Sequence, residues 1–247
     1  MVTRPRDQAA GLAALIEAAG GRALLYPAIE IEDLPDPSAA LNVLKNLAQL
    51  DLAIFVSPTA VRKAFDLLKK ARLSWPAGLR AATVGQGSRD ELERYGVHGA
   101  LVPETGADSE ALLALPALAA VAGKRIAIFR GEGGRELLGD TLAARGAKVE
   151  YAACYRRTRP RLDVAPLLSA WARGAVHAVT VSSTTGLDNF AEMLGVPGPT
   201  LLAGTPVFVP HPRVAEQARR LGIRSPLLAG PSDAEIMARL VAYFNEP

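Results

Sequence analysis

The sequence has very few of the residues on which disulfide, thiol and metal chemistry depend. Its 247 residues include one cysteine and three histidines. A single cysteine excludes an intrachain disulfide, and His98, His177 and His211 are too far apart in the sequence to resemble a metal-binding motif. Cys154 lies in an apolar run, and no histidine or basic residue stands at a spacing that would mark the thiol as activated. We therefore expect a buried thiol and no bound metal.

Long hydrophobic runs and clusters of one charge are also missing. No apolar stretch reaches the length of a membrane span, and the N-terminus lacks the hydrophobic segment of a signal peptide. The net charge is only +3 and the arginines are scattered, which disfavours nucleic-acid binding but suits a small anionic ligand. Aromatic residues make up 5% and hydrophobic residues 49%, so the core is expected to be aliphatic. We expect a cytoplasmic protein without membrane or nucleic-acid partners.

Motifs for nucleotide binding and for serine hydrolysis are incomplete or absent. The run that begins at Gly131 lacks the Gly-Lys-Ser/Thr ending of a P-loop, and the run that begins at Gly85 lacks the third glycine of a dinucleotide fingerprint. No Gly-x-Ser-x-Gly elbow occurs. The sequence therefore favours neither class.

What the sequence does contain is a regular alternation of short apolar runs and amphipathic helical patterns. This alternation predicts an α/β fold with parallel sheets and right-handed crossovers. The expected strands are Leu24–Ile31, Leu52–Ser57, Ala81–Val84, Gly99–Val102, Arg125–Phe129, Val149–Tyr155, Ala178–Ser182, Pro206–Val209 and Leu227–Ala229. The expected helices are Arg6–Ala19, Thr59–Lys70, Ser88–Tyr95, Arg135–Arg145, Thr185–Leu194 and Arg213–Leu221.

An internal repeat recurs at an offset of about 125 residues. The run Phe55–Val61, with Phe65 downstream, aligns with the run Thr180–Gly186, with Phe190 downstream. Extended over the chain, the repeat gives two kinds of segment in the order A, B, A, B. The segments cover about residues 1–32, 51–115, 123–157 and 177–240.

Two pairings of these segments would each give two similar α/β lobes. The lobes could form sequentially, or the first A segment could pair with the last B segment while the inner two pair with each other. The nested pairing needs two connectors, at about residues 32–38 and 158–164, and both contain proline and charged residues as linkers should. It would give one lobe from residues 1–34 plus 165–247 and another from residues 38–157. The repeat alone does not choose between the two pairings.

Six loops at the expected carboxyl ends of the strands are rich in glycine and small polar residues. Ligands of open parallel sheets bind at this edge, where helix N-termini present backbone N–H groups to anions. Ordinary helix capping is the alternative reading of each single loop, whereas the duplicated set favours a cleft that binds several carboxylates or phosphates. The candidate binding residues are Thr3, Arg4, Ser57, Thr59, Gly85, Gln86, Gly87, Ser88, Arg130, Gly131, Gly133, Ser182, Ser183, Thr184 and His211.

Tyr155 is expected at the end of its strand, just before a run of arginines. Its hydroxyl could donate a proton to a departing group in the cleft. The alternative is that its ring fills the end of the strand as a structural residue.

Several of these motifs together resemble the uroporphyrinogen-III synthase family, and the resemblance extends over essentially the whole chain in order. The motifs are Thr3-Arg4-Pro5, Ile54–Val61, Val84-Gly85, Ile126–Glu136, Tyr155-Arg156, Ser182-Ser183-Thr184 and Asn189-Phe190. One loop departs from the family pattern, because Val209-Pro210-His211-Pro212-Arg213 stands where the family commonly has glycine followed by serine or threonine. Proline has no N–H to donate, so His211 is the expected substitute in this loop.

The resemblance implies the nested pairing, with two parallel-sheet α/β lobes joined by a two-stranded connector. It implies a linear tetrapyrrole substrate, hydroxymethylbilane, which bears eight carboxylates and is cyclised with inversion of ring D and loss of water. It implies no metal or organic cofactor, a monomer, and Tyr155 as the acid that assists departure of the hydroxyl. A non-enzymatic two-lobe protein that binds a small polyanion is the alternative reading of the same loops.

Overall fold

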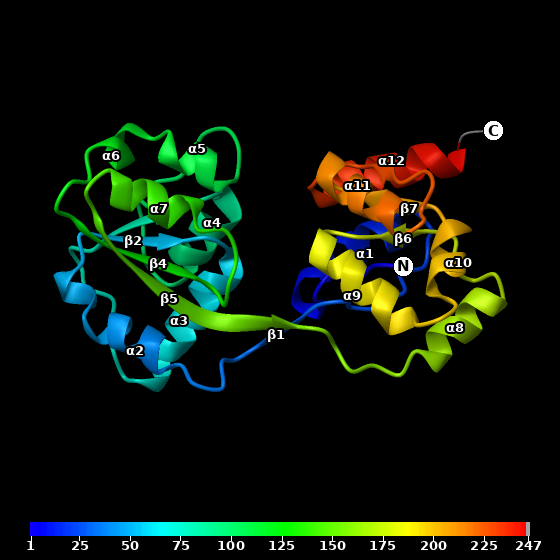
Figure 1. Ribbon diagram of the computed structural model, residues 1–247, viewed down its shortest axis with the longest axis horizontal. Helices are drawn as coiled ribbons and strands as arrows, with labels where there is room; N and C mark the ends of the chain where they lie inside the picture. Colours follow the sequence, from blue (N-terminus) through cyan, green and yellow to red (C-terminus); the bar gives the residue numbers. More distant parts are fainter. Residues whose placement is uncertain (246–247) are drawn as a thin grey trace. The chain divides into compact units, whose positions relative to one another are not determined.

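The computed structural model describes residues 1–245, and its chain forms two compact α/β units. Unit 1 combines residues 1–31 with the chain from Thr158 onward, and unit 2 is Glu32–Arg157. The dark-blue start of the chain and its part from yellow-green to red in Figure 1 therefore build one unit, and the segment between them builds the other.

Unit 2 is built on a sheet in which segments from distant parts of the chain alternate. The strand order is β1-β5-β4-β2-β3, and the pairs β5–β4, β4–β2 and β2–β3 are parallel. A further parallel bridge joins Ala82 to Leu101 beyond β3. The strands are β1 (Glu30–Glu32), β2 (Leu52–Phe55), β3 (Arg80–Thr83), β4 (Arg125–Gly131) and β5 (Lys148–Thr158).

Both faces of this sheet are covered by helices, which explains why its strands are continuously apolar. Ile54 and Ile128 pack with leucines of α5, α6 and α7 on one face. Phe55 and Phe129 stack on the other face with ring centres 4.8 Å apart, and α3 lies on this side (Figure 1). The helices are α2 (Ser38–Lys45), η2 (Leu47–Gln49), α3 (Pro58–Lys70), α4 (Gln86–Arg94), α5 (Ser109–Leu113), α6 (Pro116–Ala119) and α7 (Leu137–Ala144).

Unit 1 repeats this sheet with shorter strands. The strands β6 (Val179–Thr180), β7 (Val207–Val209) and β8 (Leu227–Leu228) are parallel neighbours in that order. Val2 adds parallel bridges to Thr180 on one side and to Leu25 on the other. The helices are η1 (Arg6–Gln8), α1 (Ala10–Ala18), α8 (Ala165–Ala172), α9 (Thr184–Leu194), α10 (Gly198–Ala203), α11 (Pro212–Arg220) and α12 (Asp233–Asn245).

Alternation along β7 sends side chains to two separate hydrophobic clusters in unit 1. Val207 and Val209 pack with α8, α9, α10 and α11, while Phe208 packs with α1 and α12. All three residues are almost completely buried. Because the strands of this sheet are only two or three residues long, the sheet is stabilised mainly by the helices packed on it.

The two sheets have the same order of repeat segments, which confirms the duplicated and nested α/β fold. In unit 2 the strands β5 and β4 of an A segment lie beside β2 and β3 of a B segment. In unit 1, Leu25 and Val2 of the other A segment lie beside β6, β7 and β8 of the other B segment. The neighbouring strands β1 and β5 contain the two points where the chain passes from one unit to the other. Arg156 of β5 donates two hydrogen bonds to Glu32 of β1, at 2.9 and 2.7 Å.

Several expected strands were wrong in their extent, and among them β2 ends at Phe55 and β6 covers only Val179–Thr180. The segment expected as the strand Leu24–Ile31 makes one bridge at Leu25 and then β1 from Glu30, and between them the N–H groups of Tyr26 and Ala28 bond to the carbonyls of Val2 and Thr3. The segment expected as the strand Gly99–Val102 makes only the bridge at Leu101. The strand expected to end at Tyr155 continues to Thr158, since pairing in the sheet outweighs the charge of its arginines.

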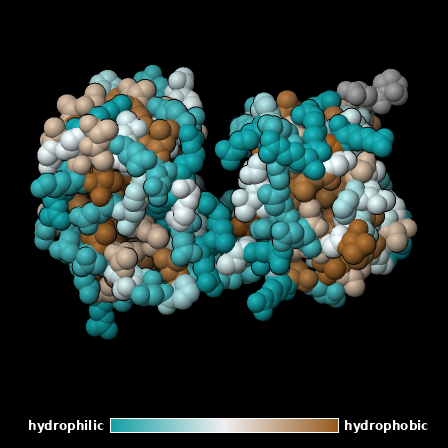
Figure 2. Space-filling model, viewed as in Figure 1, coloured by the Kyte–Doolittle hydropathy of each residue, from teal (hydrophilic) through white to brown (hydrophobic). Residues whose placement is uncertain are grey.

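Hydrophobic residues on the face shown in Figure 2 form separated patches with hydrophilic residues around them in both units. None of the helices within residues 1–245 combines the length and the apolar character needed to cross a membrane.

Gly131 at the end of β4 is a position where only a glycine fits the neighbouring side chain. A Cβ atom at this position would lie 2.8 Å from Cε2 and 2.9 Å from Cζ of Tyr155. Both atoms belong to a fully buried ring, so neither the ring nor the backbone of β4 can move aside without a cost in packing energy.

We predict that Gly131→Ala destabilises the protein, because overpacking a buried contact costs about 1–3 kcal/mol. A loss of this size lowers Tm by roughly 2 to 12 °C in a chain of this length, measured by calorimetry. Gly87→Ala is the matched control, since a Cβ at Gly87 would meet nothing closer than Pro58 at 3.6 Å. Equal Tm values for the two variants would contradict the tight contact at Gly131.

Candidate active site

The candidate loops of unit 2 follow the carboxyl ends of adjacent parallel strands. Phe55 of β2 is in register with Thr83 of β3 and with Phe129 of β4, and Gly131 is in register with Tyr155 of β5. The residues just beyond these positions therefore share one edge of the sheet, which is the edge where ligands of such sheets bind.

Tyr155 lies at this edge with its side chain fully buried. Its hydroxyl oxygen is 3.2 Å from Oγ of Ser57 and accepts a hydrogen bond from Nη2 of Arg157 at 2.9 Å. The guanidinium carbon of Arg157 lies 5.3 Å from the centre of the Tyr155 ring. Since Tyr155 lies within β5 rather than at its end, its hydroxyl is covered by neighbours.

Ser57 fixes the start of α3 as well as the Tyr155 hydroxyl. It is the N-cap residue, and its Oγ accepts a hydrogen bond from the backbone N–H of Ala60 at 3.0 Å. Thr59 is buried in the first turn of α3, where Nη2 of Arg62 donates to its Oγ1 at 3.4 Å. Of these two candidates, Ser57 is the one in contact with Tyr155.

The Gly85 loop presents backbone donors at the N-terminus of α4. Gly85 is the N-cap residue, and Oγ1 of Thr83 donates to its carbonyl at 3.1 Å. Ser88 is buried and its N–H bonds to the same carbonyl at 3.1 Å. Gln86 and Gly87 are exposed at the first two positions of the helix, where N–H groups have no intrahelical acceptor. These two N–H groups are the anion-binding candidates of this loop.

Arg130 is engaged inside its own loop. Its guanidinium donates to the carbonyl of Gly133 and lies 4.8 Å from the centre of the Tyr151 ring. Gly133 is exposed, with a φ of 67° that favours glycine. The loop thus holds Arg130 in place, and Gly131 supports the Tyr155 ring.

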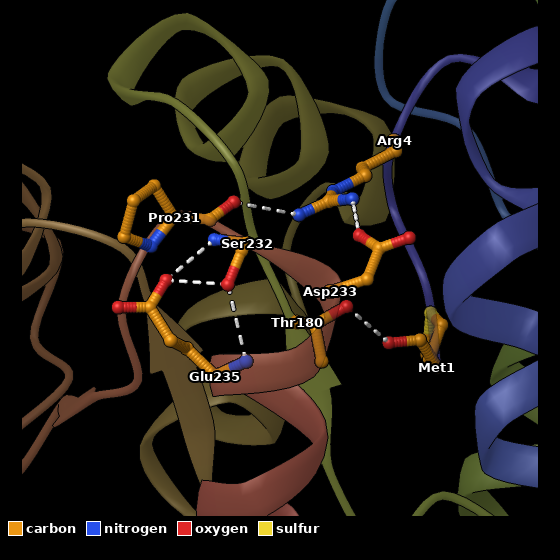
Figure 3. A network of polar contacts seen from close by, with 7 residues as sticks. All are labelled: Met1, Arg4, Thr180, Pro231, Ser232, Asp233 and Glu235. Carbon is orange, nitrogen blue, oxygen red and sulfur yellow. Dashed lines mark hydrogen bonds and ion pairs between the residues drawn. The ribbon is translucent and has the colours of Figure 1, made fainter. Parts of the chain in front are cut away.

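The candidates near the N-terminus hold parts of unit 1 together. Thr3 is buried, and its Oγ1 donates to the carbonyl of Thr180 at 2.8 Å. Arg4 forms an ion pair with Asp233 and donates to the carbonyl of Pro231 at 3.4 Å, as Figure 3 shows. Thr3 therefore ties the N-terminal segment to the sheet, and Arg4 ties it to the start of α12.

A reciprocal capping arrangement fixes the same helix start (Figure 3). Oε2 of Glu235 accepts from the N–H of Ser232 at 2.9 Å, and Oγ of Ser232 accepts from the N–H of Glu235 at 3.2 Å. The hydrogen bonds from Ser232, with a smaller effect of His211, lower the pKa of Glu235.

The remaining candidates of unit 1 stand at two helix N-termini. Ser183 caps α9 by accepting from the N–H of Gly186 at 3.0 Å, and its neighbours Ser182 and Thr184 are partly exposed. His211 is exposed at the N-cap of α11 and makes no side-chain capping bond. Pro212 follows at the first helical position without an N–H, so this loop offers fewer backbone donors than the others.

Two hollows lie away from all of these residues. One, of about 350 Å³, is lined in unit 2 by Asp33, Lys63, Lys70 and Cys154 among others. The second, of about 500 Å³, lies in unit 1 between the ends of α1 and α12. Neither is lined by a candidate residue, and we place no substrate in them.

The structure thus brings Ser57 and Gly131 into contact with Tyr155 in unit 2, with the Gly85 loop at the same edge. Sequence reasoning missed Arg157, which completes this cluster. The signal was its position two residues after Tyr155, because alternate residues of a strand share a face. The expected strand ended before it.

Comparison with known proteins agrees with this duplicated α/β class. The model of the family described as uroporphyrinogen-III synthase HemD matches residues 10–237. The uroporphyrinogen-III synthases of Salmonella typhimurium and Escherichia coli K12 are each 31% identical over 97% of this chain and 98% of their own length. The chain belongs to the uroporphyrinogen-III synthase family.

Solved structures of uroporphyrinogen III synthases from other organisms share the fold. Uroporphyrinogen III synthase from the extremely thermophilic bacterium Thermus thermophilus gives a TM-score of 0.65 at 20% identity, over 99% of this chain and 98% of the other. The corresponding protein from Helicobacter pylori 26695 gives a TM-score of 0.61 at 16% identity, over 92% and 94%.

The buried thiol expected from the sequence is confirmed. Cys154 is buried, and burial raises the pKa of its thiol to about 12. Within residues 1–245, no three His, Cys, Asp or Glu side chains cluster as a metal site.

We predict that Cys154 resists alkylation by iodoacetamide at pH 8 in the folded protein. A thiol with a pKa of about 12 remains protonated there, and the thiolate is the reacting species. Mass spectrometry should show complete labelling only after unfolding in urea. Native labelling at the rate of the unfolded chain would contradict the burial of this thiol.

Proposed function

We propose that the protein cyclises hydroxymethylbilane to uroporphyrinogen III, with inversion of ring D and loss of water, as a hydro-lyase of tetrapyrrole biosynthesis. The observation that carries this proposal is membership of the family over residues 10–237. The near full-length similarity to two curated synthases supports it further. A non-enzymatic binding protein is not favoured, since the match covers the chain rather than one loop.

The proposed reaction starts with departure of the substrate hydroxyl. Cleavage of this C–O bond leaves an azafulvene, which a substituted carbon of ring D attacks to give a spiro intermediate. Fragmentation and reclosure at the other carbon then give the inverted ring. A proton donated to the leaving hydroxyl departs with it as water, and the macrocycle releases a proton on closure. The acid is thereby restored, and no external oxidant or reductant is consumed.

We assign the proton donor to Tyr155. Its hydroxyl lies at the carboxyl edge of the sheet and contacts Ser57, whose Oγ is fixed by the N–H of Ala60. A hydroxyl held by a capping residue has a defined direction, which a general acid needs. The ring is fixed against Gly131, so that the donor is positioned before the substrate arrives.

We assign the substrate carboxylates to backbone donors at helix N-termini. In unit 2 these are the N–H groups of Gln86 and Gly87 at the start of α4. In unit 1 we assign the loop of Ser182, Ser183 and Thr184 at the start of α9, which the repeat aligns with the loop at the start of α3. Helix N-termini attract anions without a lysine cluster, which fits a net charge of only +3. The reaction then relies mainly on the geometry imposed on a reactive substrate.

The proposed reaction requires no metal, organic cofactor, nucleic acid or membrane. One chain carries both sets of candidate loops, and we propose that it acts as a monomer. The expected cytoplasmic location stays a prediction.

We predict that the purified protein converts freshly prepared hydroxymethylbilane to the type III isomer, separated from type I by chromatography after oxidation. Without enzyme the substrate closes unrearranged, so the isomer itself reports catalysis. Formation of type I alone, at the spontaneous rate, would contradict the proposed function.

We predict that Tyr155→Phe lowers turnover by roughly 100-fold or more, because a positioned acid contributes about that factor. Ser182→Ala is the comparison, since loss of one shared hydrogen bond costs about 1 kcal/mol, or less than tenfold. Tyr155→Phe keeps the buried ring and removes only the hydroxyl. If a folded Tyr155→Phe protein turned over at the wild-type rate, Tyr155 would be a structural residue.

A further inference from the structure

Arg157 differs from two other arginines of unit 2, Arg135 and Arg156, because its contacts are with a neutral group. Within residues 1–245 its guanidinium contacts the hydroxyl and the ring of Tyr155, and no acidic residue pairs with it. Its neighbour Arg156 is paired with Glu32, and Arg135 with Glu110. The Arg157 side chain is exposed, so a charged ligand can reach it.

A guanidinium is poorly matched to a single phenol oxygen. It carries five N–H donors in a planar fork that fits both oxygens of a carboxylate. A carboxylate adds a negative charge and a second acceptor oxygen, so the fork can donate two parallel hydrogen bonds to it, which a neutral phenol oxygen does not allow. Arg157 therefore forms a stronger interaction with a carboxylate than with the Tyr155 hydroxyl.

The hydroxyl that Arg157 contacts belongs to a buried residue. Tyr155 has no exposed surface, so no substrate atom can contact its hydroxyl in this arrangement. Its other neighbours are fixed, because Ser57 caps α3 and Gly131 belongs to the backbone of β4. Arg157 is the exposed and flexible neighbour, and it is the one that can move without disturbing a helix or strand.

We infer that Arg157 binds a carboxylate of the substrate, and that this exchange of partner uncovers the Tyr155 hydroxyl. The inference rests on the proposed function, which supplies a substrate with eight carboxylates. Arg157 is then a binding and positioning residue, while Tyr155 remains the proton donor. Binding of the correct anion and access to the acid are coupled through one side chain.

The test is the effect of Arg157→Gln on KM and kcat for hydroxymethylbilane, measured in the wild-type and Tyr155→Phe backgrounds. Loss of a charge-assisted contact should raise KM by about 10- to 100-fold. The kcat at saturating substrate should stay within about threefold, because the hydroxyl is already uncovered. Arg157→Lys should give an intermediate KM, since lysine keeps the charge but not the planar fork.

The Tyr155→Phe background separates binding from mere orientation of the tyrosine. A carboxylate contact of Arg157 predicts the same rise in KM when the hydroxyl is absent. If Arg157 only orients the hydroxyl, Arg157→Gln lowers kcat in the wild type, leaves KM unchanged and has no further effect in Tyr155→Phe. That outcome, or unchanged kinetics throughout, would overturn the inference.

Arg80→Gln is the matched control, because Arg80 is an exposed arginine at the opposite end of β3 in the same sheet. Its kinetics should equal those of the wild type. Circular dichroism and Tm check that each variant is folded. If the wild-type protein does not produce the type III isomer, the proposed function is wrong. If the wild-type protein does produce it and Arg157→Gln has the same kinetics as Arg80→Gln, the inference about Arg157 is wrong.

Discussion

The parallel pairing of β2 with β4 is the constraint on which the candidate site of unit 2 depends. It joins segments about 75 residues apart, and its register places Phe55 beside Phe129. Stacking of these two buried rings fixes that register, because a slip of one residue would turn every side chain to the other face. Ser57 and Gly131 each lie two residues beyond the stacked pair, which brings them to the same buried tyrosine. Unit 1 repeats the arrangement where Val2 and β7 flank Thr180.

The contacts of the buried Tyr155 both stabilise the fold and hold the proposed acid in place. The ring occupies space that a side chain at position 131 would need, while its hydroxyl has Ser57 and Arg157 as partners. A buried hydroxyl without partners would cost about 1–3 kcal/mol, so these contacts also stabilise the fold. The arginines that we expected to bind anions, Arg4 and Arg130, are instead held within their own units. Anion binding is therefore assigned to backbone N–H groups and to Arg157.

The sequence predicted the fold class, the repeat and the starts of α3, α4 and α9 to within two residues, because glycine and serine at helix N-termini are local signals. It also predicted which loops share an edge, since the ends of parallel strands meet. It did not predict the surroundings of Tyr155, which depend on a glycine of a neighbouring strand and on the length of β5. Nor did it predict Asp233 as the partner of Arg4, because 229 residues separate the two.

In the proposed mechanism, the Tyr155 hydroxyl exchanges its contact with Arg157 for one with the ligand when the ligand binds. The most direct measurement is an NMR titration of protein labelled with ¹³C at Cζ of its five tyrosines, with Tyr155→Phe used to assign the signal and uroporphyrinogen III as the added product. We predict that the Tyr155 signal shifts as the site fills, while that of Tyr95, at the far end of α4, stays in place. A Tyr155 signal that remains unchanged at saturation would contradict the account.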